Sequence, residues 1–187
     1  MKLISSGPFR GLIAILVCVV CSVSISAQRR DYLTDEEIEV VRDAQDIDAR
    51  VGVLIKMIDR RFAVLGINVN GWKDGEKTSS TWGEPPKGAR SELLNDIKKI
   101  LQKAVDDIDN LAANPNSAPI RDKDDKRAKK DPERFPKAVR ALAAASKRYL
   151  DPLKMELDRS TRDEEKGSII DSIDLCNQII DAVGRLP

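Results

Sequence analysis

Carboxylates are the most numerous side chains in this sequence that could carry out chemistry. They crowd two stretches, with Glu36, Glu37, Glu39, Asp43, Asp46 and Asp48 in the first and Asp106, Asp107 and Asp109 in the second. Carboxylate oxygens are the ligands that hard cations such as calcium prefer. Acidic residues are equally typical of helix starts, where the helix dipole favours them, and of exposed helix faces. We favour an exposed face and predict no metal site.

Other kinds of catalytic or cofactor site are excluded by composition. The sequence contains no histidine, and Cys176 is the only cysteine after residue 27. This rules out imidazole-based triads, histidine-ligated haem, Glu-x-x-His di-iron sites and zinc held by cysteine and histidine. No phosphate-binding loop, dinucleotide-binding glycine motif or Gly-x-Ser-x-Gly motif occurs. We therefore predict no cofactor and no enzymatic activity, and an enzyme that uses carboxylates alone is the alternative.

A charged segment near the middle of the chain invites comparison with a calcium-binding loop. Asp122, Asp124 and Glu133 have the spacing of the first, third and last ligands of an EF-hand. However, Lys126 takes the place of a further ligand, and Arg127 replaces the glycine that the loop requires. These two departures exclude the EF-hand interpretation.

Trp72 and Trp82 are the only tryptophans, and both lie between expected helices. Tryptophan is favoured at binding interfaces, so the pair is a candidate surface for a protein partner or a sugar. Large aromatic side chains also tend to be buried, and in this second interpretation both rings fold back over the helices. We favour the second interpretation and keep Trp72 and Trp82 as candidate partner-binding residues. Cys176 falls in an apolar series, and we expect a buried, unreactive thiol.

The elements that must position these residues are helices. Apolar residues recur at the spacing of amphipathic helices at about residues 35–65, 90–113, 135–159 and 162–185. In the first of these segments, Arg61 alone breaks the apolar series. Thr34 with Glu37, and Thr161 with Glu164, have the spacing of capping boxes at helix starts. Pro152 is expected to kink or split the third helix near Tyr149.

The fold that buries four such faces most simply is all-α. The short link between the third and fourth helices requires them to run antiparallel. Two long connections remain, at residues 66–89, where Asn70-Gly71 is a hairpin-turn signal, and at residues 114–134. The sequence therefore predicts an antiparallel up-down four-helix bundle with a long loop between helices 1 and 2.

The first 27 residues have the pattern of a secretory signal peptide. Lys2 and Arg10 precede an apolar run from Gly11 to Val23, and small residues follow up to Ala27. We expect cleavage after Ala27 or after Ser26, which leaves residues 28–187 as a single domain. Two alternatives are an uncleaved membrane anchor and lipidation at Cys18 or Cys21, although valine precedes each of these cysteines.

Charge balance limits the partners of the processed chain. Residues 28–187 carry 30 basic and 31 acidic residues, because Lys2 and Arg10 are the only charged residues before Arg29. This balance argues against nucleic-acid binding, which needs a basic surplus, and against binding to acidic membranes. A single remaining cysteine allows no internal disulfide bond. We expect a periplasmic or secreted protein that is held together by packing alone and has a protein partner, if any.

One part of the sequence resembles a known group of proteins. The segments Tyr-Leu-Thr-Asp-Glu-Glu-Ile-Glu-Val-Val-Arg-Asp-Ala-Gln and Ile-Lys-Met-Ile-Asp-Arg-Arg resemble uncharacterised, small, secreted helical proteins of soil bacteria over about 35 residues. Leu33-Thr34 is also similar to the Leu-Thr-x-x-Gln motif of Spy-like periplasmic chaperones, with Glu37 in place of the glutamine. The first resemblance implies no activity. The second implies a chaperone-like or stress-response protein, as the alternative to a non-enzymatic interaction or structural protein of the cell envelope.

Overall fold

The described part of the chain, residues 30–72, 80–114 and 132–186 of this computed structural model, contains helices and no strand. The expected signal peptide at residues 1–27 and nearly all of the charged segment at 122–133 lie outside the described residues. The chain divides into residues 1–31 and a helical unit of residues 32–187. The elements of this unit are α2 (Asp35–Asp43), α3 (Ile47–Val64), η2 (Ser80–Trp82), α4 (Arg90–Ala113), α5 (Arg134–Arg159), α6 (Asp163–Ala182) and η3 (Val183–Arg185). The predicted all-α class is confirmed for these residues.

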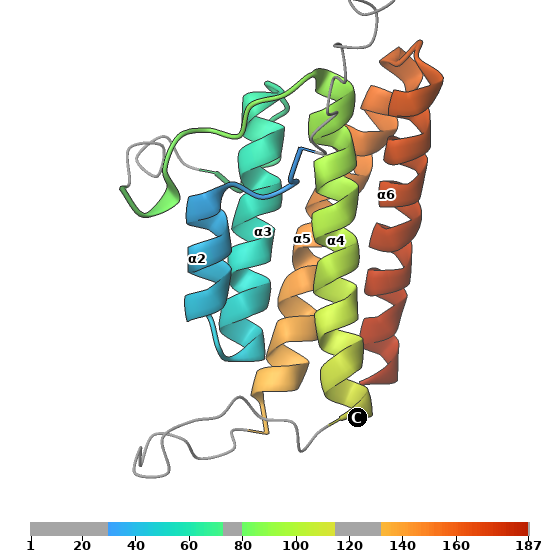
Figure 1. Ribbon diagram of the computed structural model, residues 1–187. Helices are drawn as coiled ribbons and strands as arrows, with labels where there is room; N and C mark the ends of the chain where they lie inside the picture. Colours follow the sequence, from blue (N-terminus) through green and yellow to red (C-terminus); the bar gives the residue numbers. More distant parts are fainter. Residues whose placement is uncertain (1–29, 73–79, 115–131, 187) are drawn as a thin grey trace, which may run out of the picture. The chain divides into compact units, whose positions relative to one another are not determined.

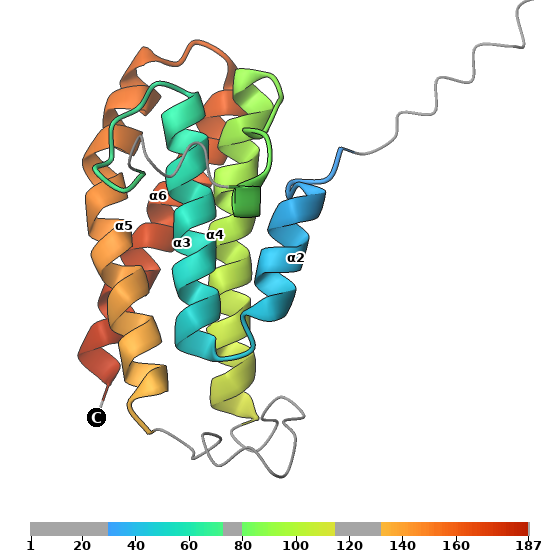
Figure 2. The ribbon, with the colours of Figure 1, turned by 90° about the vertical axis from the view of Figure 1, so that its left-hand side faces the viewer.

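The four longest helices lie side by side and enclose the core (Figure 1, Figure 2). α3 packs against α4 and α5, and α6 packs against the same two helices. The side chains between them come from the apolar series that the sequence shows, because these series place one apolar stripe on each helix. The fully or almost fully buried members include Val51, Leu54, Ile58, Ile97, Leu101, Leu142, Leu153, Ile169 and Cys176.

The expected single helix at about 35–65 needs correction, because it is divided into α2 and α3. The backbone leaves the helical region at Ala44, which has a ψ of 82°, and α3 begins at Ile47. α2 then lies alongside α3 instead of extending it (Figure 2). The expected capping box is present at the start of α2, where the Thr34 and Glu37 side chains each accept a hydrogen bond from the other's backbone N–H.

Two further expectations about helix ends differ from the structure. α5 is not split at Pro152 but runs unbroken through it to Arg159. Tyr149 and Leu153 on either side of the proline are completely buried, and this packing offsets the hydrogen bond that proline cannot donate. α6 begins at Asp163 with Arg162 as its N-cap and without a side-chain cap, so Thr161 and Glu164 do not form the second capping box.

Candidate functional site

The two tryptophans, which lie ten positions apart in the sequence, meet in space. Their rings make an edge-to-face contact with centroids 5.8 Å apart and an angle of 85° between the planes. Trp82 is 8% exposed, whereas Trp72 is half-buried. The burial of Trp82 agrees with the interpretation in which the tryptophan rings fold back over the helices. The partly exposed Trp72 ring makes this pair, together with Arg60 beside it, the candidate site.

Arg60 is a second neighbour of the Trp72 ring. Its guanidinium carbon lies 6.0 Å from the ring centroid, a distance at which a cation and an aromatic ring attract each other. The same guanidinium donates to the carbonyl oxygens of Gly83 (2.8 Å) and Glu84 and to Glu37 Oε1 (3.1 Å). Arg60 is only 3% exposed. It therefore connects the segment that carries Trp82 to α2 and is also a neighbour of the Trp72 ring.

The segment that leads to Trp72 is fixed from the other side by α5. Arg148 Nη1 donates to the Val69 carbonyl oxygen at 2.6 Å, and Val69 is buried. Gly71 passes so close to α3 that a Cβ atom there would lie 2.0 Å from Asp59 Oδ2. Only glycine fits at this point, because the Asp59 carboxylate is itself held in place by its partners. The backbone that leads to Trp72 is therefore bonded to Arg148 of α5 and packs closely against Asp59 of α3.

Those partners make Asp59 part of a second buried polar cluster. Tyr149 Oη donates to Asp59 Oδ1 at 2.7 Å, and Arg148 Nη2 lies 3.3 Å from Oδ2. Burial, together with the neighbouring Asp59 charge and this hydrogen bond, raises the pKa of Tyr149 well above its usual value. Tyr149 therefore stays protonated and acts as a fixed donor, so this cluster has the character of a structural support.

A third cluster joins α2 to α3 and contains a completely buried carboxylate. Arg61 donates to both oxygens of Glu37, at 2.6 Å each, and to the Tyr32 carbonyl oxygen at 2.6 Å. Glu37 is 0% and Arg61 1% exposed. Within the described residues, Arg61 Nε has no hydrogen-bond partner, and it lies 3.9 Å from Asp96 Oδ2 on α4. Two-point pairing of this kind fixes orientation as well as distance, so it determines where α2 lies.

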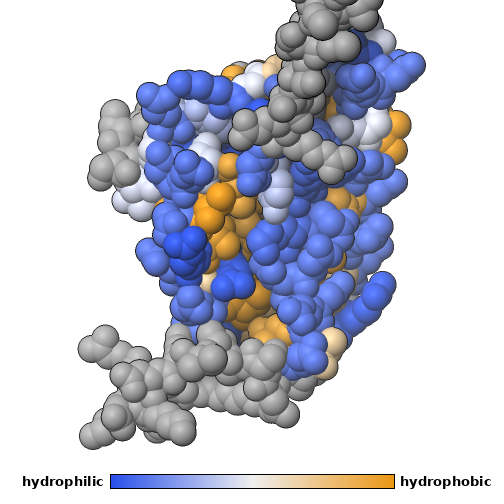
Figure 3. All heavy atoms as spheres, in the orientation of Figure 1, coloured by the Kyte–Doolittle hydropathy of each residue, from blue (hydrophilic) through white to orange (hydrophobic). Residues whose placement is uncertain are grey.

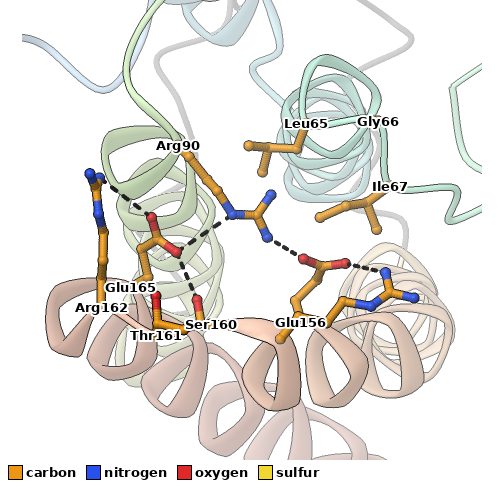
Figure 4. A pocket seen from close by; sticks show the side chains of 10 residues that line it. Leu65, Gly66, Ile67, Arg90, Glu156, Ser160, Thr161, Arg162 and Glu165 are labelled. Carbon is orange, nitrogen blue, oxygen red and sulfur yellow. Dashed lines mark hydrogen bonds and ion pairs between the residues drawn. The ribbon is translucent and has the colours of Figure 1, made fainter.

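A pocket of about 430 Å³ lies where α5 turns into α6 (Figure 4). Arg90 of α4 stands between Glu156 and Glu165, which are 7% and 6% exposed, and forms ion pairs with both. Arg159 pairs with Glu156 at 3.2 Å, and the Ser160 hydroxyl donates to Glu165 at 2.7 Å. Each glutamate is thus held by several donors. The cluster ties α4 to the α5–α6 turn, and the exposed arms of Arg159 and Arg162 are the groups that an anionic ligand would meet.

The acidic stretches and the cysteine occupy different surroundings. Glu36, Glu39 and Asp43 are exposed on α2, and Lys103 pairs with Asp107 on α4 at 3.0 Å. Among the residues that the structure describes, no group of three or more cysteine, aspartate or glutamate side chains could hold a metal ion. Cys176 is completely buried, as expected, and this burial raises its pKa to about 12, so it is not a reactive thiol.

The sequence pointed to Trp72 and Trp82 but not to the residues that hold them. Arg60, Asp59 and Arg148 have the spacing of ordinary exposed charges, and their partners come from distant parts of the chain. Arg61 did give a signal, because it is a charged residue at a position where the apolar series requires a buried one.

Comparison with protein-family models, with curated proteins and with solved structures finds no match to this chain. Within the described residues, no helix has both the length and the apolar character needed to cross a membrane.

Proposed function

We propose that this chain is an exported, non-enzymatic protein that binds a protein partner in the cell envelope, and that Trp72 is the centre of the contact surface. We also propose that α3, α4, α5 and α6 form an antiparallel up-down four-helix bundle, to which α2 is added. The observation that carries the proposal is the half-buried Trp72 ring, which makes an edge-to-face contact with Trp82 and lies next to the guanidinium of Arg60.

Rigid aromatic side chains suit binding for a physical reason. Tryptophan and arginine are the residues that most often dominate the binding energy of protein interfaces. A side chain that is already held in place loses little conformational entropy when a partner arrives, so more of its contact energy appears as affinity. Trp72 meets this condition, because neighbours from α3 and from residues 80–84 fix it.

The buried charges support binding over catalysis. A catalytic carboxylate needs to reach a substrate, whereas Glu37, Asp59, Glu156 and Glu165 are each buried against an arginine. These pairs join separate elements of the helical unit. They are therefore best explained as supports for the fold.

A Spy-like, chaperone-like role is the second candidate, and one observation favours it. Figure 3 shows apolar side chains gathered in a strip between α2 and α4. Half-buried apolar residues on these elements and on α3 include Val40, Val41, Ile47 and Ile108. A chaperone would need such a strip to bind unfolded clients. Binding of the dye ANS and slower aggregation of a model client would support this role, and the absence of both effects would contradict it.

Partner binding is tested by comparing two matched aromatic variants. Trp72→Ala removes the proposed contact, whereas Tyr32→Ala removes another half-buried ring that also faces a cation, with Lys99 Nζ 5.6 Å from its centroid. Each purified protein is immobilised and exposed to envelope extract, and the affinity for any captured protein is then measured. We expect Trp72→Ala to weaken binding about 30-fold, which corresponds to about 2 kcal/mol, and Tyr32→Ala to leave it nearly unchanged. Equal affinities for folded Trp72→Ala and wild type would contradict the proposal.

Export is tested separately by cell fractionation and by the mass of the isolated protein. We expect a chain in the envelope or the medium that begins at Gln28, or at Ala27 if cleavage follows Ser26. A chain that keeps residues 1–27, or one that carries a lipid at Cys21, would contradict cleavage after Ser26 or Ala27. A full-length chain in the cytoplasm would contradict export as well.

A further inference from the structure

The link between α2 and α3 contains no residue that must interrupt a helix. Residues 44–46 are Ala-Gln-Asp, without glycine or proline, and alanine has the highest helix propensity of all residues. The apolar spacing also continues through the link, from Val40 and Ala44 to Ile47 and Val51. The local sequence therefore allows one continuous helix, although Asp46 is also a favoured N-cap residue and α3 begins directly after it.

The turn has contacts at the link and far from it. At the link, Arg50 Nε donates to the Ala44 carbonyl oxygen at 3.0 Å, and Asp46 forms an ion pair with Arg134 of α5. α2 is held at Glu37, which Arg61 and Arg60 bind from the far end of α3. Arg61 also binds the carbonyl oxygen of Tyr32, just before α2. In the described residues, α2 packs mainly on α3 and on η2. Apart from the contacts at the link, nothing here requires the α2 and α3 that meet to belong to the same chain.

We propose that α2 exchanges between two copies of this chain, so that the protein forms a dimer in which each α2 docks on the other copy. The link at residues 44–46 becomes helical, and α2 and α3 join into a helix of about 45 Å. Glu37 of each copy then binds Arg61 and Arg60 of the other copy. The proposal does not rest on the partner-binding role of Trp72.

The direction of the helices allows this exchange. α2 runs antiparallel to its own α3, since the two helices are joined by a short link and lie side by side (Figure 1, Figure 2). If two copies with straightened helices meet at their link ends around a two-fold axis, each α2 again runs antiparallel to the α3 that it contacts. The exchanged contacts can therefore reproduce the intramolecular ones, which is the condition for domain swapping.

The balance between the two forms depends on the link and on protein concentration. Both forms make the same Glu37–Arg61 contact, so this contact does not favour either of them. The exchanged form gains a helical link. It loses the bond of Arg50 to the Ala44 carbonyl oxygen and the freedom of two separate molecules. It should therefore become more populated as concentration rises, and a change of helix propensity at the link should shift the equilibrium.

Two substitutions at one position test the proposal. Asp46→Ala favours a helical link, whereas Asp46→Pro opposes one, because proline in a helix interior costs roughly 3 kcal/mol. Both variants lose the ion pair of Asp46 with Arg134, so this loss cancels in the comparison. Asp46 has a φ of −82°, close to the value that proline adopts, so the closed form accepts proline.

The measurement is the dimer fraction by light scattering over about a hundredfold range of concentration. We expect the dimerisation constant of Asp46→Ala to exceed that of Asp46→Pro by at least about tenfold, because one proline costs a helix that much or more. Equal constants, or a dimer that is insensitive to both changes, would overturn the proposal. If Asp46→Pro does not fold, insertion of two glycines after Gln45 replaces it, since a longer flexible link also favours the closed form. A dimerisation constant for that insertion equal to the Asp46→Ala constant would overturn the proposal in the same way.

Discussion

The α5–α6 pair and the α2–α3 pair are both joined by three-residue links, but different forces hold them. α5 and α6 contact each other along their length through buried, mostly apolar or small side chains, among them Ser146, Ile169 and Cys176. α2 buries a single residue, Glu37, and a charged cluster holds it. A similar link thus leads to two quite different kinds of contact between neighbouring helices.

The two pairs should differ in how much each depends on individual residues. Apolar packing has no preferred direction, and its strength grows with the area that is buried. A buried ion pair gains little over an apolar contact, yet it is costly to break because the remaining charge has no partner. The α2–α3 contact should therefore depend on a few atoms, whereas the α5–α6 contact should be spread over many.

The largest effect is expected from breaking the buried ion pair. In Arg61→Met, Arg60 is the only arginine that still bonds to the buried Glu37 carboxylate. The free energy of unfolding should therefore fall by about 3–5 kcal/mol. The double variant Glu37→Leu/Arg61→Met removes both charges and should recover at least half of this loss. Urea denaturation followed by circular dichroism measures both. A double variant as unstable as the single one would show that the charges contribute net stability to the α2–α3 contact.

A slightly smaller effect is expected in the apolar pair. Ile169→Ala creates a cavity between α6 and its neighbours, because Ile169 is completely buried, and should lower the free energy of unfolding by about 3 kcal/mol. The matched change on α2, Val40→Ala, affects a half-buried side chain and should cost less than about 1 kcal/mol. Equal losses at the two positions in the same denaturation experiment would contradict the contrast between the two pairs.

The sequence predicts the apolar pair well because its signals are local. The spacing of apolar residues that runs through Leu142, Ile169 and Cys176 reports which side of each helix is buried, and the structure buries these residues. The all-α class follows from the same periodicity.

The charged pair could be predicted only in part. Arg61 interrupts an apolar series, which signals a buried charge, but its partner Glu37 lies 24 positions away and also has a capping role. The break at residues 44–46 gave only a weak signal, because the link lacks glycine and proline and only Asp46, a favoured N-cap residue, marks the start of α3. Tertiary contacts decide this turn, and the sequence pattern describes only neighbours along the chain.

The candidate site shows the same limit. Trp72 and Trp82 stand out by residue type, and the structure brings them into contact. Their supports, such as Arg60 with Gly83 and Arg148 with Val69, join segments 23 and 79 positions apart. Arg90 with Glu156 is a similar case, with a separation of 66. No spacing rule relates residues at such distances, so only the structure reveals these pairs.

The α5–α6 pair should also show its buried thiol through pH dependence. Cys176 keeps its proton up to a pKa of about 12 when folded, whereas an unfolded thiol loses it near pH 8.5. Between these values the unfolded state binds fewer protons, so the free energy of unfolding should fall by about 1.4 kcal/mol per pH unit.

Cys176→Ala should remove this part of the pH dependence. Part of the decline should remain above pH 10, because the raised pKa of Tyr149 acts in the same direction. Urea denaturation of wild type and Cys176→Ala between about pH 8 and 11 measures how the free energy of unfolding of each protein changes with pH. The difference between their free energies of unfolding at neutral pH gives the cost of the lost packing. Parallel curves would contradict a thiol that stays protonated in the folded protein.

The smallest effect is expected from an exposed ion pair on α2, and it decides what holds that helix. Arg42 Nη1 lies 2.7 Å from Glu39 Oε2, and the two side chains are 65% and 59% exposed. Because water screens such pairs, Glu39→Gln should change the free energy of unfolding by no more than about 0.5 kcal/mol. Glutamine keeps the size of the side chain and one acceptor oxygen, so the difference between urea denaturation at low and at high salt isolates the effect of the charge. A loss above about 1 kcal/mol that disappears in high salt would mean that surface charge holds α2, and the contrast with α5–α6 would then not depend on Glu37 and Arg61.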